Sequence, residues 1–251
     1  MISLRGKRAL VTGGSRGIGA ATALLLAECG ADVGIGYRSR EVEASAVVKQ
    51  MAGRGVRAFA QAADVGTRVG SDQLFARVQR EFGGLDLFVG NAGIWPADDV
   101  PVTELDDARW HRTLVENVDS MFFTTRAAAR LMGAGSRIVL ISSTAAQRGE
   151  SYHADYAASK GAMLAFVKSL AIELAPRDIT VNSVAPGWVD TEMCALPFAD
   201  GGRERIASGI PIGRVATAQD IAGPVVFLCS DHARHITGEV LNVNGGSVLC
   251  G

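Results

Sequence analysis

The stretch Arg8-Ala9-Leu10-Val11-Thr12-Gly13-Gly14-Ser15-Arg16-Gly17-Ile18-Gly19 decides the fold. Its first five residues are mostly apolar and partly β-branched, which predicts a buried strand. The glycine-rich turn leads into the run 18–29, which predicts a helix ending at Gly30. A strand, a glycine turn and a helix in this order direct backbone N–H groups at a phosphate. The alternative is a glycine-rich turn that binds no ligand.

Three glycines of this turn have separate predicted tasks. Gly13 allows the tight turn, Gly17 allows a pyrophosphate to approach the backbone, and Gly19 allows the helix to pack closely on the strand. The turn therefore predicts a dinucleotide site at the start of the chain.

Outward from this turn, apolar strands alternate with helical patterns. Further strands are predicted at 31–37, 56–60, 85–89, 137–143, 179–184 and 239–243. Further helices are predicted at 41–52, 74–82, 106–132, 156–175 and 217–228. This alternation predicts an α/β protein whose residues 1–251 form a single Rossmann-type domain: a doubly wound parallel sheet of about seven strands flanked by helices. Ligands are expected at the carboxyl ends of the strands.

Composition excludes several function classes. The chain has 251 residues, 48% of them hydrophobic, which suits one domain with a large core. Its net charge of −1 argues against nucleic acid or an anionic membrane as a partner. The start lacks the apolar core of a signal peptide, and no apolar run is long enough for a membrane span. Four separated cysteines (Cys29, Cys194, Cys229, Cys250) predict free thiols in a reducing cytoplasm and no metal site.

The end of the second strand bears on the choice of cofactor. Dinucleotide folds that prefer NAD carry a carboxylate there, which binds the ribose 2′-hydroxyl. Here Tyr37 stands in that place and is followed by Arg38, and Arg16 lies in the glycine turn. Two guanidinium groups suit a 2′-phosphate, so we expect NADP(H). The alternative is a solvated basic turn.

Tyr156 and Lys160 lie four residues apart in a segment that predicts a buried helix. That spacing places both side chains on one helical face. A phenol normally loses its proton near pH ~10, and a neighbouring ammonium lowers its pKa, which prepares a tyrosine for proton transfer. The alternative is an ordinary pair on a helix face.

Other features mark the predicted strand ends and loops. Asn117 interrupts the long helix 106–132 as a poor helix former, so we expect a kink there or a backbone group freed for a ligand, with a solvated asparagine as the alternative. Ser143 ends the fifth strand, where such sheets bind ligands. His153, three residues before Tyr156, is expected in a surface loop, with a contact to the substrate as the alternative. Residues 188–211 are too apolar for a solvated linker and predict a substrate lid, with an oligomer contact as the alternative.

With these residues placed, the chain resembles the short-chain dehydrogenase/reductase family over nearly its whole length, and most closely its β-ketoacyl-carrier-protein reductase-like members. The matching motifs are Thr12-Gly13-x-x-x-Gly17-x-Gly19, Asp64-Val65, Asn91-Ala92-Gly93, Asn117, Ser143, Tyr156-x-x-x-Lys160 and Pro186-Gly187-x-x-x-Thr191.

The resemblance implies a role for each motif. Tyr156 would be the general acid/base, Lys160 would lower its pKa and bind the nicotinamide ribose, and Ser143 would hold the substrate oxygen. Asn117 would fix a water that relays protons through Lys160. The cofactor-binding set would be Gly13, Ser15, Arg16, Gly17, Ile18, Gly19, Arg38, Asp64, Val65, Asn91, Ala92, Gly93, Tyr156, Lys160, Pro186, Val189 and Thr191. A homotetramer is also implied.

The predicted function is therefore an NADP(H)-dependent oxidoreductase of a carbonyl/secondary alcohol pair. The apolar segment after Trp188, together with Trp95, favours a substrate with an apolar or ring-bearing body. One alternative is a 3-oxoacyl-carrier-protein reductase proper. Against it, the basic cluster with which those reductases dock the carrier is replaced by Met132-Gly133-Ala134-Gly135-Ser136. The other alternative is a catalytically idle nucleotide-binding sensor or scaffold.

Overall fold

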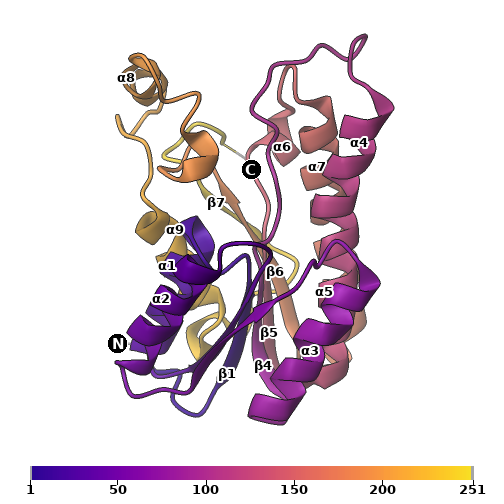
Figure 1. Cartoon of the computed structure of the whole chain (residues 1–251), viewed down its shortest axis with the longest axis vertical. Coiled ribbons are helices and arrows are strands. Elements are labelled where there is room, and N and C mark those ends of the chain that lie inside the picture. Colours follow the sequence, from indigo (N-terminus) through magenta and orange to yellow (C-terminus); the bar gives the residue numbers. More distant parts are fainter. Residues whose placement is uncertain (1, 250–251) are drawn as a thin grey trace.

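A seven-stranded parallel sheet forms the centre of the computed structural model, which describes residues 2–249 (Figure 1). Its strand order is β3-β2-β1-β4-β5-β6-β7, and every neighbouring pair is parallel. The order reverses direction between β1 and β4, which makes the sheet doubly wound, as predicted. The strands are β1 (Arg8–Thr12), β2 (Asp32–Tyr37), β3 (Ala58–Ala62), β4 (Leu85–Gly90), β5 (Met132–Ile141), β6 (Thr180–Pro186) and β7 (Val240–Val243).

Helices cover both faces of the sheet (Figure 1). They are α1 (Gly17–Glu28), α2 (Glu41–Ala52), α3 (Arg68–Phe82), α4 (Asp107–Leu114), α5 (Ser120–Leu131), α6 (Ala145–Arg148), α7 (Ala154–Leu174), α8 (Gly202–Ser208) and α9 (Ala218–Leu228). One layer contains α1, α2 and α9, and the other contains α3, α5 and α7. The predicted three-layer architecture is thus confirmed.

Two apolar cores lie between these layers because side chains of a strand alternate between the faces of a sheet. Ala9 and Val11 of β1 belong to the core beneath α1, α2 and α9, whereas Leu10 belongs to the core beneath α3, α5 and α7. All three side chains are fully buried. Because both faces are covered, the strands read as continuous apolar runs rather than as alternating ones.

The boundaries differ from the predicted ones where tertiary context overrides a local signal. The fifth strand begins at Met132, five residues before the apolar run at Arg137, and the sixth continues to Pro186. The short helices α6 and α8 lie within predicted loops. The last helix begins with a capping box, in which the Thr217 hydroxyl accepts from the Asp220 N–H and the Asp220 carboxylate accepts from the Thr217 N–H.

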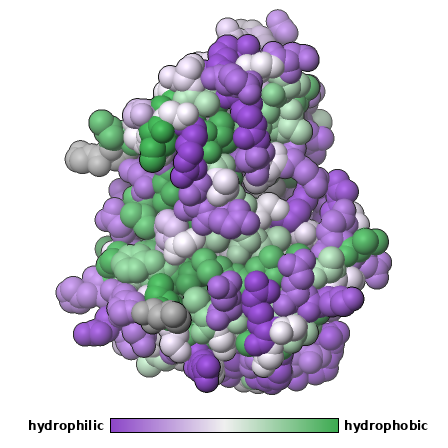
Figure 2. Space-filling view, turned by 90° about the vertical axis from the view of Figure 1, so that its left-hand side faces the viewer, coloured by the Kyte–Doolittle hydropathy of each residue, from purple (hydrophilic) through white to green (hydrophobic). Residues whose placement is uncertain are grey.

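The face that carries α1, α2 and α9 has a mixed surface. Figure 2 shows hydrophobic side chains in a band across its middle, surrounded by hydrophilic ones. Within residues 2–249, no helix combines the length and the apolar character needed to cross a bilayer. Cys29, Cys194 and Cys229 are free thiols, and Cys250 lies outside the described residues.

Candidate active site

The glycine turn between β1 and α1 forms one end of a groove at the carboxyl edge of the sheet. Gly13 and Gly17 have φ angles of 64° and 54°, a region that disfavours residues with a side chain. A Cβ atom on Gly19 would lie 2.2 Å from the carbonyl oxygen of Gly13. The lack of a side chain at Gly19 therefore lets α1 approach the turn closely. Gly19 itself does not line the groove.

The ends of β1 and β4 are fastened together beside this turn. The Thr12 hydroxyl accepts hydrogen bonds from the N–H groups of Asn91 and Ala92, each at 3.0 Å. The Asn91 amide donates back to the carbonyl oxygens of Thr12 and Gly13, at 3.0 and 3.2 Å. These bonds fix the floor of the groove at the point where the strand order reverses.

Most of the predicted cofactor residues lie along this groove. Those that line it are Gly13, Ser15, Arg16, Gly17, Ile18, Arg38, Asp64, Val65, Asn91, Ala92, Gly93 and Thr191. They come from the ends of β1, β2, β3 and β4 and from the segment after β6. A glycine turn at a helix N-terminus, an exposed carboxylate at Asp64 and arginines at the far end together fit a phosphorylated dinucleotide.

Two carboxylates that the sequence reading missed share the groove with these arginines. Arg16 forms an ion pair with Glu192, and Arg38 forms one with Glu116. Arg40 also reaches Glu192, with 3.3 Å between Nη2 and Oε2. Both glutamates line the groove, so they would compete with an incoming phosphate for these arginines.

Asn117 lies in a π-helical turn, Val115–Asp119, that separates α4 from α5. Its buried side-chain amide accepts a hydrogen bond from the Ile94 N–H at 2.8 Å and donates to the Ile94 carbonyl and to Ser159 Oγ. The predicted interruption of the long helix is therefore present, and it ties α5, α7 and the segment after β4 together. The side chain does not itself line the cavity, but it holds Ile94, which does.

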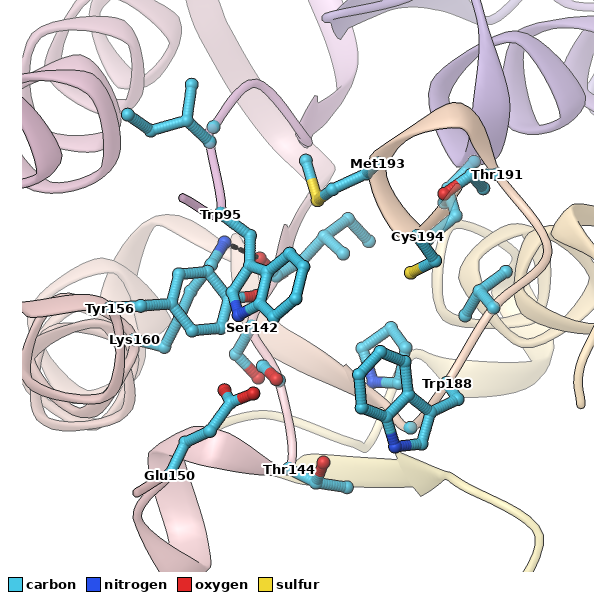
Figure 3. A pocket seen from close by; sticks show the side chains of 18 of the residues that line it. Trp95, Ser142, Thr144, Glu150, Tyr156, Lys160, Trp188, Thr191, Met193 and Cys194 are labelled. Atoms are coloured by element: carbon cyan, nitrogen blue, oxygen red, sulfur yellow. Dashed lines mark hydrogen bonds between the residues drawn. The ribbon is translucent and has the colours of Figure 1, made fainter. Parts of the chain in front are cut away.

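A second cavity, of about 810 Å³ and open to solvent, adjoins the groove (Figure 3). The predicted residues Ser143, Tyr156, Lys160, Pro186 and Val189 line it. Ile18, Asn91, Gly93 and Thr191 line both the cavity and the groove. A dinucleotide in the groove would therefore extend to the tyrosine.

Burial is the main influence on the pKa values of Tyr156 and Lys160. It raises the pKa of Tyr156, with hydrogen bonding to Ser143 acting in the opposite direction, and it lowers the pKa of Lys160 to about 8. The Lys160 Nζ donates to the Ile141 carbonyl at 2.9 Å and lies 5.8 Å from the centre of the Tyr156 ring. The tyrosine pKa is thus raised by burial, the opposite direction from the lowering expected beside an ammonium.

Asp155 connects the tyrosine helix to α4. Its fully buried carboxylate accepts from Thr113 Oγ1 at 2.7 Å and from Arg109 Nε at 3.2 Å. Burial alone would raise the pKa of Asp155, but the hydrogen bonds from Thr113, Arg109 and the Tyr156 backbone outweigh it and lower the pKa. The bonds from Arg109 and Thr113 to Asp155 fix the start of α7 and therefore the position of Tyr156.

Aromatic rings form one wall of the cavity. Trp95 and Trp188 both line it and meet edge to face at 5.9 Å (Figure 3). Phe198 packs on Trp188 at 5.9 Å. The prediction of a surface-loop histidine at His153 is wrong, because this side chain is 3% exposed and stacks on Trp95 at 4.7 Å. The ring of His153 supports the indole from behind.

Comparisons with known proteins identify relatives of this chain. A family described as enoyl-(acyl carrier protein) reductase matches residues 13–247. The 3-oxoacyl-[acyl-carrier-protein] reductase FabG of Escherichia coli K12 is 39% identical over 250 residues, covering 99% of this chain and 100% of the relative. Versicolorin reductase 1 of Aspergillus parasiticus is 40% identical, with 97% of each chain covered. A solved short-chain dehydrogenase from Burkholderia cenocepacia J2315 in complex with NADP is 41% identical, with a TM-score of 0.92 and coverage of 97% and 98%.

Proposed function

The chain belongs to the short-chain dehydrogenase/reductase family, and on that premise we propose that it reduces a ketone with an apolar or ring-bearing body at the expense of NADPH. The observation that carries the proposal is the meeting of Ser143, Tyr156 and Lys160 in one cavity that adjoins the nucleotide groove. When bound, NADPH supplies the hydride that the carbonyl carbon accepts.

Proton transfer to the carbonyl oxygen is the task of this chain's own residues. Ser143 holds the substrate oxygen, and Tyr156 donates the proton that turns it into a hydroxyl. Because burial raises the pKa of Tyr156, the phenol is protonated at neutral pH, which is the form that a reduction needs. Lys160, hydrogen-bonded to the Ile141 carbonyl, holds positive charge beside the ring and replaces the proton through a water near Asn117.

The aromatic wall supports the assignment of substrate class. Trp95 and Trp188 present flat apolar surfaces on one side of Tyr156, and Met193 and Cys194 from the segment after β6 complete the cavity. Such a lining favours a flat or apolar body over a small polar acid. We assign residues 188–211 as the lid over this body, hinged where the Asp190 N–H donates to the Ala216 carbonyl.

The carrier-protein alternative is weaker in the structure than in the sequence. Arg137 is 4% exposed and Arg177 donates to the carbonyls of Ala129 and Met132, so both are engaged within the protein. Arg130, at the end of α5, is the exposed arginine that remains beside residues 132–136. A free ketone therefore suits the surface better than an acidic carrier protein does. The idle-sensor alternative would leave the complete Ser143, Tyr156 and Lys160 set without a task.

The test is turnover by Tyr156→Phe. NADPH consumption with a panel of aryl and alicyclic ketones should fall by about 10²–10⁴-fold, since that is what a positioned acid contributes. The dissociation constant for NADPH should stay within about twofold, because the phenol hydroxyl is not needed to hold the groove. A variant that reduces its best ketone at nearly the parent rate would remove Tyr156 from the proposed role.

A further inference from the structure

One carboxylate lies in the aromatic cavity without a task in the reaction. Glu150, in the loop between α6 and α7, lines the cavity with Trp95, Trp188 and Tyr156. Figure 3 shows its carboxylate directed into the cavity on the side of Tyr156. The ion pairs within residues 2–249 do not include it. The two oxygens of this carboxylate can accept more than the one hydrogen bond that the Trp95 side chain offers, so the cavity has room for a further donor.

The surroundings of Glu150 are half-buried and carry some positive charge. Burial raises its pKa, while His153, a hydrogen bond that the carboxylate accepts from the Trp95 side chain, and the nearby Arg148 act to lower it. Arg148 lines the same cavity from its exposed rim. With or without its proton, the carboxyl group accepts a hydrogen bond from a hydroxyl.

We propose that Glu150 determines substrate specificity by accepting a hydrogen bond from a hydroxyl group carried on the ring of the ketone. The inference rests on the proposed ketone reductase function and deepens it. The substrate class becomes a neutral, hydroxylated ring ketone, held at its carbonyl by Ser143 and Tyr156 and at its hydroxyl by Glu150.

Charge decides between a hydroxyl and the other donors. An ammonium group on the substrate would meet Glu150 but also the positive charge of Arg148, which lines the same cavity. A carboxylate on the substrate would be repelled by Glu150. A neutral O–H group carries neither penalty, and its hydrogen bond to a carboxylate is of the stronger, charge-assisted kind.

The experiment uses ortho-, meta- and para-hydroxyacetophenone, each compared with its methyl ether, which cannot donate. The parent enzyme should favour at least one hydroxy isomer over its ether by about 10- to 100-fold in kcat/KM, the range of one hydrogen bond to a charged group. Glu150→Met, similar in length but without an acceptor, should bring this ratio close to one. Glu150→Gln should keep about 2- to 10-fold, because its amide oxygen still accepts.

The ratio of kcat/KM for a hydroxy ketone to that for its methyl ether separates recognition of the hydroxyl group from other effects of replacing Glu150. The charge of Glu150 also raises the pKa of Tyr156, so its removal alters catalysis, but it does so equally for a hydroxy ketone and its ether. Glu104→Gln, the same chemical change at an exposed residue outside the cavity, should leave every ratio at the parent value.

Three outcomes overturn the inference: no hydroxy preference in the parent enzyme, a preference that survives Glu150→Met, or a larger preference for para-(aminomethyl)acetophenone. Absence of any ketone-dependent NADPH consumption would instead refute the proposed function. In that case, quenching of Trp95 and Trp188 fluorescence by the same compounds, in NADP-loaded protein, still measures the binding ratio and decides for or against Glu150.

Discussion

Glu116 and Arg38 should act on cofactor binding in opposite directions. Arg38 lies on the groove wall where the 2′-phosphate of NADPH is expected, and its guanidinium is paired with Glu116. Replacing Arg38 by Asp removes a cation and adds an anion at that place. Replacing Glu116 by Gln leaves the arginine intact and removes its competing partner.

The size of both effects follows from the solvent exposure of the Arg38 and Glu116 side chains. The Arg38 side chain is 54% exposed and the Glu116 side chain 23% exposed, so the pair lies in the range of about 0–1 kcal/mol for surface ion pairs. Freeing Arg38 in Glu116→Gln should therefore tighten NADPH by about two- to fivefold. A hydrogen bond from Arg38 to a doubly charged phosphate contributes about 1.5–3 kcal/mol before screening. Arg38→Asp should weaken NADPH by about 10- to 100-fold and leave NADH within about threefold.

Fluorescence titration of NADPH and NADH gives both dissociation constants, and kcat/KM with each cofactor gives the matching kinetic ratio. Arg68→Asp, at an exposed arginine of α3 outside the groove, is the control for the change of charge. The reasoning is refuted if Arg38→Asp weakens both cofactors equally, because the arginine would then read the shared part of the dinucleotide. It is also refuted if Glu116→Gln leaves NADPH binding unchanged.

Three further predictions concern stability and assembly. Lys160→Met should raise the free energy of unfolding at pH 7, because burial lowers the lysine pKa to about 8 in the folded protein. Between pH 8 and the ordinary lysine pKa of 10.5 the unfolded parent chain binds more protons than the folded one, so the stability of the parent rises with pH. The stability difference between Lys160→Met and the parent should therefore shrink in denaturant titrations at pH 7, 9 and 10.5. Asp155→Asn should cost about 3–5 kcal/mol by urea unfolding, since it leaves buried Arg109 without its charge partner, whereas Asp72→Asn at the surface should cost less than about 1 kcal/mol; equal losses would contradict the buried-pair argument. The family resemblance implies a tetramer built on α5 and α7, and Ile172 on α7 is 79% exposed, so light scattering at micromolar concentration should report four chains for the parent and fewer for Ile172→Glu; a monomeric parent would contradict it.

The order of elements could be predicted because it depends on short-range signals. Apolar runs of strand length, helical periodicity and glycines between them occur within a dozen residues of one another, and right-handed crossovers then leave one doubly wound arrangement. The interruption at Asn117 could be predicted for the same reason, since a poor helix former in a long helix is a local conflict. The spacing of Tyr156 and Lys160 on one helical face needed no tertiary contact either.

The sequence by itself thus determined the parallel sheet, the phosphate turn after β1 and the helical face shared by Tyr156 and Lys160. Only the tertiary structure decided which charges and rings meet. Glu192 reaches Arg16 across 176 positions and Glu116 reaches Arg38 across 78, while His153 is buried because Trp95, from another loop, stacks on it. No local pattern encodes such partners, because a charged or aromatic side chain in a loop looks the same in sequence whether it faces water or a neighbour. Packing decides between the two, since burial is stable only where a distant segment supplies the matching surface.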